Sequence, residues 1–491
     1  MKNFVLLCHS RLDSYPYGAA LPMALFALGA FLESKGIEVE YFDEETDSGD
    51  RFKKLLAKGP LWAGFSVRGG RQIASALALS RRARKLAPEC RIVWGGIFPS
   101  ALPGQVLSET CVDCVAIGEG EETLAELAGA AQAGTPDLSR IYGIAYRQDG
   151  RCVITPPRPS PDISLLPFPY QGKALPRLRR YLLDSGGKAA VGYETSRGCP
   201  FTCDFCYSRA FHGPIRMKPL ATLAGEAALL RALGVSLLDI YDDTFRGGDP
   251  AEIAAYAELL REASLQWLAN FRVEAVSAEL IGKLHDSGCR ELYFGLEAGD
   301  DNTLRTLHKG FSAGQVRAAL EVLARSRIPA VYSLIAGLPG PGYKNDISRC
   351  LTFADEIHKI HPAAEIQIQS YVPLPGTPLY PKAIEAGFKP PDRPAGWLLH
   401  DHIHVLCPWL DAPALPRKLY LSSFLAYRYN RRLDFFPINL AAYPLHKLSL
   451  WRIRHRFFGL YFETFLYDLF RLARRWDAHC RRHSRPFRFT A

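Results

Sequence analysis

Apolar and polar stretches alternate at regular intervals along the first part of the chain. Short apolar runs typical of buried strands lie at Phe4–Cys8, Val39–Phe42, Leu61–Val67, Ile92–Trp94 and Val112–Ile117. Apolar residues with helical spacing separate several of these runs, most clearly over Gln72–Leu86 and Glu121–Ala133. Continuous apolar strands that alternate with helices are typical of a parallel sheet covered on both faces. The pattern therefore predicts an α/β fold that begins with a doubly wound, Rossmann-like domain over residues 1–140.

A second alternation follows a proline-rich stretch. Residues 141–180 carry a cluster of prolines from Pro156 to Pro176, which is typical of a linker. Six further strand-like runs lie at Ala189–Tyr193, Leu237–Tyr241, Trp267–Val273, Glu291–Gly295, Ala330–Ile335 and Glu365–Val372. Helical patterns between them include Leu223–Leu233, Ala251–Ala263, Ala278–His285 and Gln315–Ser326. These repeats predict a partial (β/α)6 barrel over residues 181–390, with its functional groups at the carboxyl ends of the strands.

The remaining residues, 391–491, are predicted to form a helical, basic and aromatic C-terminal region. Residues 416–491 hold 16 Lys and Arg against 4 Asp and Glu, although the whole chain has a net charge of only +10. One apolar run, Phe457–Phe470, would be about 21 Å long as a helix, too short to span a bilayer. Two interpretations stay open: peripheral contact with a membrane surface, or packing on the barrel with an arginine-rich outer face. We expect no nucleic-acid binding, because no RNA-binding motif accompanies the arginines.

An uncharged stretch near the start must also be weighed as a membrane span. Ser14–Leu32 carries no charge over 19 residues, but Pro16 and Pro22 argue against a span. Pro22 suits the first turn of a buried helix of about a dozen residues. The first residues lack the pattern of a secretory signal, and most of the 12 cysteines are isolated. We therefore expect a cytoplasmic protein, either free or peripheral to the inner face of the membrane.

The strongest chemical signal is a group of three cysteines just after the first barrel strand. Cys199, Cys203 and Cys206 have C-x3-C-x2-C spacing. Zinc normally takes four ligands, commonly in two pairs, and the nearest other pair, Cys111 and Cys114, lies in the other domain. Three thiolates instead leave one iron of a cubane cluster without a protein ligand, so that it can bind a substrate or cofactor. The spacing favours an iron–sulfur site over a zinc site or an accidental cluster of buried thiols.

With Phe205 in the aromatic position, the motif C-x3-C-x-aromatic-C resembles that of the radical S-adenosylmethionine (SAM) enzymes. The resemblance implies a [4Fe–4S] cluster on the three cysteines, with SAM on the open iron. One electron from an external flavodoxin- or ferredoxin-type donor would then yield a 5′-deoxyadenosyl radical that removes hydrogen from a substrate. Segments at the following strand ends resemble those of the family in order and spacing. The candidate SAM-binding residues are Phe205, Asp242, Asp243, Arg272, Glu297 and Gly337.

The first domain resembles the cobalamin-binding domain that precedes the barrel in one branch of this superfamily. The matching segments, Gly64–Gly70, Trp94–Pro99 and Val112–Thr123, follow strands, where an open parallel sheet places its ligand crevice. The candidate cobalamin-binding residues are Ser66, Val67, Arg68, Gly95, Gly96, Gly118, Glu119 and Gly120. The glycines alone would equally suit turns without a ligand, or with another nucleotide.

The better-known cobalamin enzymes supply a histidine to cobalt from an Asp-x-His-x-x-Gly segment. That segment is absent here, and His9 is the only histidine before residue 200. This absence is usual in the radical branch, in which no histidine replaces the benzimidazole on cobalt. Arg68 or Val67 would then face the lower side of the corrin, and a plain surface role for Arg68 stays equally open.

The resemblance implies a cobalamin-dependent radical SAM enzyme with a [4Fe–4S] cluster, SAM and cobalamin. Its first expected activity is methylation of an unactivated carbon in a hydrophobic or natural-product-like small molecule. A cyclase or another radical reaction without methylation is the alternative within the same architecture. RNA methylthiolases also resemble this arrangement, but they carry three more cysteine ligands, for which the first domain shows no matching pattern. A cobalamin sensor with a structural cluster is the alternative from another class.

Overall fold

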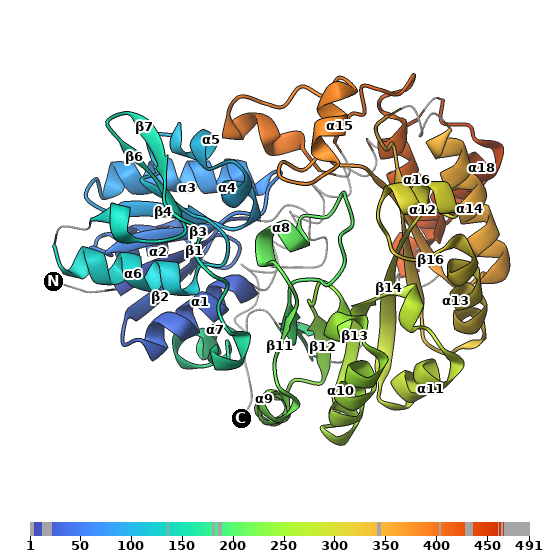
Figure 1. Ribbon diagram of the computed structural model, residues 1–491, viewed down its shortest axis with the longest axis horizontal. Coiled ribbons are helices and arrows are strands. Elements are labelled where there is room, and N and C mark those ends of the chain that lie inside the picture. Colours follow the sequence, from blue (N-terminus) through green and yellow to red (C-terminus); the bar gives the residue numbers. More distant parts are fainter. Residues whose placement is uncertain are drawn as a thin grey trace.

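The computed structural model describes residues 4–11, 22–134, 137–178, 182–184, 189–340, 345–401, 404–427, 436–459, 461–462 and 465. Two α/β halves lie side by side, and the C-terminal helices cover the outer side of the second half (Figure 1). The predicted fold class is confirmed, with the α/β domain first, the strand–helix repeats next and a helical region last.

The first half contains one seven-stranded sheet in the order β2-β1-β3-β4-β5-β6-β7. Its first five strands are parallel: β1 (Phe4–His9), β2 (Glu38–Asp43), β3 (Trp62–Ser66), β4 (Arg91–Gly95) and β5 (Cys114–Ala116). Val5 and Leu7 pack in one core cluster with α1 (Met23–Ser34) and α6 (Glu121–Gln132). Phe4 and Leu6 pack in another with α2 (Gly49–Leu56) and α3 (Gln72–Leu86). Both faces of β1 are therefore buried, which explains its unbroken apolar run.

Two antiparallel strands extend this sheet into the stretch that the sequence predicts as linker. β6 (Ile144–Gln148) pairs with β5, and β7 (Arg151–Ile154) pairs with β6. Asp149 and Gly150 connect them with φ of 49° and 74°, the left-handed backbone of a tight hairpin turn. The dipeptide Asp-Gly is a known hairpin signal, and it marks strands that the proline-based reading did not include.

The second half contains a seven-stranded open sheet in the order β16-β15-β14-β13-β12-β9-β8. Six strands are parallel, as predicted: β9 (Ala189–Tyr193), β12 (Leu237–Ile240), β13 (Gln266–Phe271), β14 (Cys289–Glu297), β15 (Ala330–Ala336) and β16 (Glu365–Ser370). β8 (Leu183–Asp184) joins the edge in antiparallel orientation. The main helices are α9 (Leu220–Ala232), α10 (Pro250–Glu262), α11 (Ala278–Asp286), α13 (Ala313–Arg325) and α14 (Asp346–Ile360). They lie on the outer side of the curved sheet (Figure 1).

The segment after β16 reaches back to the first half. It contains α15 (Tyr380–Glu385) and runs along the upper edge in the view of Figure 1. Trp397 is 2% exposed and packs in the core of the first sheet, with its ring 6.2 Å from that of Phe98. Nε1 of Trp397 donates to Oε1 of Gln105 at 2.9 Å. This strap fixes the first half against the barrel.

The described part of the C-terminal region packs on the last strand of the barrel. α16 (Leu415–Tyr427) lies against β16, where the backbone N–H of Ile368 donates to Oγ of Ser423 at 2.9 Å. α18 (Phe436–His455) packs against α16, and Arg452 near its end is only 3% exposed. Most of the run Phe457–Phe470 lies outside the described residues.

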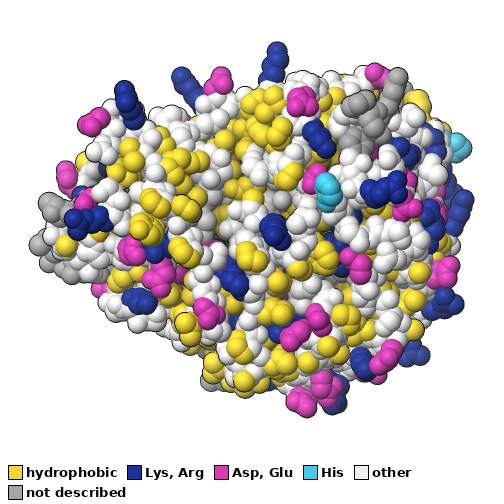
Figure 2. Space-filling model, viewed as in Figure 1, with side chains coloured by type: hydrophobic (Ala, Val, Ile, Leu, Met, Phe, Trp, Pro, Cys, Tyr) yellow, Lys and Arg dark blue, Asp and Glu magenta, His cyan; other side chains and the backbone are white. Residues whose placement is uncertain are grey.

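Charge and length bear on the membrane question. On the face shown in Figure 2, Lys and Arg side chains are scattered among acidic ones and form no single basic patch. None of the described helices is long and apolar enough to cross a bilayer. The uncharged stretch Ser14–Leu32 overlaps α1, which begins right after Pro22 and is 12 residues long, as predicted.

Candidate active site

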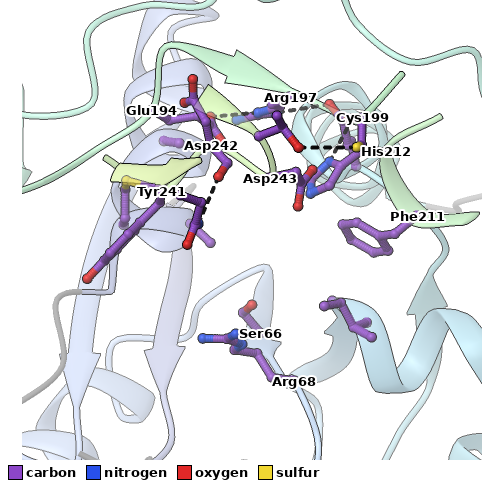
Figure 3. Close-up of a pocket in the computed structure, with 18 of the residues that line it drawn as sticks. Ser66, Arg68, Glu194, Arg197, Cys199, Phe211, His212, Tyr241, Asp242 and Asp243 are labelled. Carbon is purple, nitrogen blue, oxygen red and sulfur yellow. Dashed lines mark hydrogen bonds and ion pairs between the residues drawn. The ribbon is translucent and has the colours of Figure 1, made fainter. Parts of the chain in front are cut away.

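A cavity of about 800 Å³ lies between the two halves, and both sheets contribute their carboxyl strand ends to its wall. Ser66 and Arg68 lie on one side of it, opposite residues of the barrel such as Arg197 and Cys199 (Figure 3). Most of the residues predicted to bind cofactors line this cavity. They are Ser66, Arg68, Gly95, Gly96, Gly118, Glu119 and Gly120 from the first half, and Cys199, Cys203, Phe205, Cys206, Asp242, Asp243, Arg272 and Glu297 from the second.

Two predicted residues, Val67 and Gly337, do not line the cavity. Val67 is fully buried, and its backbone N–H donates to the carbonyl of Gly95 at 2.8 Å. Its contribution is to the backbone beside the site: a Cβ on Gly96, which has φ +97°, would come 2.9 Å from the Val67 carbonyl oxygen. A side chain at Gly337 would meet Sγ of Cys407 at 2.8 Å, on the side away from the cavity.

His9 is also directed elsewhere. Its Nδ1 lies 2.9 Å from Oδ1 of Asp43, and the side chain is 4% exposed. It is not among the residues that line the cavity. His9 therefore lies outside the cavity that the predicted cobalamin-binding residues line.

The three predicted cluster cysteines line the barrel side of the cavity together. Sγ of Cys199 lies 3.4 Å from Oγ1 of Thr244, and the backbone N–H of Ser208 donates to Sγ of Cys206 at 3.5 Å. Nη1 of Arg272 lies 4.0 Å from Sγ of Cys203, where a guanidinium can balance thiolate charge. Burial raises the pKa of the Cys206 thiol to about 11, so iron must displace a proton to bind there.

The three cysteine thiols can be compared with the ligands that a single metal ion or an iron–sulfur cluster requires. Among the described residues, no three or more His, Cys, Asp or Glu side chains surround a point that could hold a single metal ion. The three thiols share one cavity wall, and a cation stands beside one of them. Three soft donors on one loop, open to a cavity, fit a [4Fe–4S] cluster with one iron facing the cavity.

The neighbouring carboxylates Asp242 and Asp243 have different surroundings. Asp242 is fully buried, and its carboxylate accepts hydrogen bonds from the backbone N–H groups of Thr195 and Ser196 at 2.7 and 3.0 Å. The hydroxyls of both residues also donate to it. Burial raises the pKa of Asp242, although these hydrogen bonds oppose the rise. Asp243 is exposed and lines the cavity, and within the described residues its carboxylate accepts one hydrogen bond, from the N–H of Gly198 at 3.2 Å.

Glu297 ends β14 in an unusual backbone conformation. Its φ is +65°, and the pairing of β14 with β15 shifts register between Gly295 and Glu297. Its carboxylate lies 3.2 Å from Nζ of Lys309, and both side chains are buried. This positive φ coincides with the register shift, at the point where the carboxylate of Glu297 meets the cavity.

A second charged group joins the two halves, and sequence reasoning did not find it. Arg197 Nη1 lies 2.9 Å from Glu119 and 2.7 Å from Glu121, and its Nε lies 2.7 Å from Glu194. Arg197 precedes Cys199 by two residues, whereas Glu119 belongs to the predicted cobalamin loop. Glu119 and Glu121 are more than 70 residues away from Arg197 in the sequence, so no local pattern links them to it.

Comparison with known families assigns both halves. Residues 15–128 match the B12 binding domain, and residues 193–346 match the Radical SAM superfamily. Each match falls within one half of the structure: the first contains β2 to β5, and the second contains β12 to β15.

Individual proteins that resemble this chain share at most about a third of its residues in the aligned regions. An uncharacterised methyltransferase of Pyrococcus horikoshii is 28% identical over 314 residues, which cover 63% of this chain and 66% of that protein. The anaerobic magnesium-protoporphyrin IX monomethyl ester cyclase of Synechocystis sp. is 30% identical over 324 residues, 62% of each chain. This chain therefore matches less than two thirds of either relative's length. The solved cobalamin-dependent SAM radical enzyme OxsB shares the fold, with a TM-score of 0.71 and 16% identity over 96% of this chain and 75% of that one.

Proposed function

The chain belongs to the radical SAM enzymes that carry a B12-binding domain, and on this basis we propose that it methylates an unactivated carbon of a hydrophobic, natural-product-like small molecule. Its cofactors are a [4Fe–4S] cluster, SAM and cobalamin. When bound, the cluster with SAM supplies hydrogen-atom abstraction, and cobalamin supplies the methyl group. The observation that carries the proposal is the single cavity, walled by the three cysteines on one side and by the glycine loops of the B12-binding domain on the other.

On the barrel side, each residue has a role that follows from its contacts. Cys199, Cys203 and Cys206 hold the cluster. Asp243 accepts the ammonium group of SAM, because its carboxylate is exposed to the cavity and bonded to only one backbone N–H. Asp242 acts indirectly. Its buried carboxylate accepts backbone N–H groups of Thr195 and Ser196, which lead into the cysteine loop.

On the other side, Gly95, Gly96, Gly118 and Gly120 let the backbone approach the corrin and its nucleotide tail. Arg68 lines the cavity just after β3, and its guanidinium makes no hydrogen bond or ion pair with the described residues. We assign it to the lower side of the corrin. Cobalamin should then bind without a histidine on cobalt, and an EPR spectrum of the cobalt(II) state without strong axial nitrogen splitting would agree.

The proposal of a hydrophobic substrate is supported by an apolar part of the cavity wall. Side chains of α1 and of the segment after β7 form this part of the wall: Met23, Leu25, Leu28, Ile163, Leu166, Pro167 and Pro169. Apolar contact area of this kind favours a substrate with a large apolar surface.

The similarity to the magnesium-protoporphyrin IX monomethyl ester cyclase supports the alternative reaction, cyclisation without methylation. Both reactions need the same cofactors, so the product distinguishes them. Anaerobically reconstituted protein is incubated with SAM, cobalamin, a chemical reductant and candidate substrates. Formation of 5′-deoxyadenosine excludes a pure sensor, a gain of one methyl group in the product supports methylation, and a loss of two hydrogens supports cyclisation instead.

We also propose that the protein works in a reducing cytoplasm with a protein electron donor. All eleven described cysteines are free thiols, as expected in a reducing cytoplasm. The cluster needs one electron at a time, so we propose a flavodoxin- or ferredoxin-type protein as donor. Replacing the chemical reductant with such a protein and measuring 5′-deoxyadenosine tests this.

A further inference from the structure

The loop that carries the three cysteines is closed at its base by two arginines. β10 (Ser196–Arg197) pairs in antiparallel orientation with β11 (Arg216–Met217), and Arg197 lies opposite Arg216 in this pair. The three cysteines and α8 (Ser208–His212) lie between these two strands. Like charges directly opposite each other destabilise a strand pair. The closure of this loop therefore depends on a counter-charge.

A single carboxylate from the B12-binding domain supplies much of that charge. Oε2 of Glu119 lies 2.9 Å from Nη1 of Arg197 and 3.2 Å from Nη1 of Arg216, while Nη2 of Arg216 donates to Oε1. Nδ1 of His212, at the end of α8, lies 3.1 Å from the same Oε1. Burial on its own raises the pKa of Glu119, but the hydrogen bonds from His212 and Arg216 lower it to about 2. Glu119 is therefore a charged, buried contact to three points of the cysteine loop.

Of the three side chains that contact Glu119, only Arg197 has other carboxylate partners among the described residues. Arg197 also pairs with Glu121 and Glu194, at 2.7 Å in each case. Arg216 and His212 form salt bridges with no carboxylate other than Glu119 within the described ranges. Without Glu119, one strand of the pair and the end of α8 would lose their acidic partner.

Glu119 is also part of the cobalamin side of the cavity. It stands between Gly118 and Gly120, which line the cavity beside it, and Gly118 has φ +78°. A ligand bound against Gly118 and Gly120 would contact the backbone that carries the Glu119 carboxylate. That carboxylate in turn fixes the base of the loop that carries the cysteines.

We propose that Glu119 is a positioning residue that couples the two cofactor sites, so that bound cobalamin raises the affinity of the cysteine loop for SAM. This rests on the proposed function, because both cofactors must bind. The physical reason is conformational order: a loop already fixed by the first ligand loses less freedom when the second one binds. By thermodynamic linkage, SAM raises the affinity for cobalamin by the same factor.

The test compares dissociation constants in the full-length, cluster-loaded protein. SAM binding is measured by equilibrium dialysis with and without saturating hydroxocobalamin. We expect cobalamin to lower the SAM dissociation constant about fivefold or more in the wild type, the range typical of coupled sites. In Glu119→Gln, the ratio should fall close to one while the iron content is unchanged. Glu122→Gln is the matched control, because Glu122 is 44% exposed and lies 3.8 Å from Lys35, away from the loop.

Arg216→Gln removes the same contact from the barrel side, and it should lower the ratio even if Glu119→Gln does not fold. A wild-type ratio of one overturns the coupling and leaves the proposed function standing. A Glu119→Gln protein that binds both cofactors with the wild-type ratio does the same. Wild-type protein that takes up neither a cluster nor cobalamin overturns the proposed function, and the coupling with it.

Discussion

The carboxylate of Glu297 lies 3.2 Å from the ammonium group of Lys309, and both side chains are less than a tenth exposed. Nζ of Lys309 also lies 5.5 Å from the ring centroid of Phe205, the aromatic residue of the cysteine motif. The end of β14 and the cysteine loop are thus joined through one buried cation. A buried ion pair is costly to break from one side, because the remaining charge has no counter-charge.

Glu297→Gln should therefore destabilise the cofactor-free protein by about 3–5 kcal/mol, measured by urea unfolding. The double variant Glu297→Gln/Lys309→Met removes both charges and should recover most of that loss. SAM affinity separates the two roles of Glu297. If its carboxylate contacts SAM, as the sequence analysis predicts, the double variant regains stability but not affinity; recovery of both would assign Glu297 a structural role only.

The ligand assignment predicts that Cys203→Ala loses the cluster. Its Sγ is one of three thiols on the cavity wall, and two thiols cannot hold the cluster with a single open iron. Iron content and charge-transfer absorbance after anaerobic reconstitution give the measurement. Cys152→Ala is the control, because Cys152 is an exposed thiol on β7, and it should keep the full cluster. Full iron content in Cys203→Ala would contradict the assignment.

Asp346 predicts a pH dependence at the end of β15. Its Oδ2 accepts the backbone N–H groups of Gly337 and Leu338 at 2.6 and 3.2 Å, and burial raises its pKa from 3.8 to about 6. Because the folded pKa is raised, its stabilising contribution is complete below about pH 4 and is lost as the pH rises through 6. Ionisation then costs at most about 3 kcal/mol, at 1.36 kcal/mol per pKa unit.

Asp346→Asn keeps an oxygen acceptor and removes the titration. The melting temperature of this variant relative to wild type should therefore rise between pH 4 and 6 and stay constant above. Asp286→Asn, at a side chain 78% exposed, is the control and should show no such trend. A flat difference for Asp346→Asn across this range would show that the carboxyl does not titrate there.

Strands such as β1 are predicted well from the sequence, because they are buried on both faces and form unbroken apolar runs. Contacts between distant segments could not be predicted from the local pattern of apolar residues. Glu119 looks like part of a glycine loop, and only the fold brings it to Arg197. The direction of a group at a strand end is equally hidden: Asp242 and Asp243 are adjacent, yet one anchors the backbone and the other faces the cavity.

The C-terminal region allows a sharper membrane test than charge counting. Cutting the chain at Leu415 would remove α16, which packs on β16, and would expose the barrel edge. A variant ending at Phe462 keeps α16, α18 and the hydrogen bond from the Tyr461 hydroxyl to the carbonyl of Lys418 at 3.0 Å. It removes seven arginines and leaves the described packing in place.

If the removed segment contacts a membrane, full-length protein should sediment with anionic vesicles more strongly than the variant ending at Phe462. Each arginine near an anionic surface contributes about 1 kcal/mol, so the difference should shrink at high salt and vanish with neutral lipid. Equal cluster content and circular dichroism in both proteins would show that the fold is intact. Equal sedimentation with anionic vesicles would instead favour packing on the barrel, the arrangement that α16 and α18 already show.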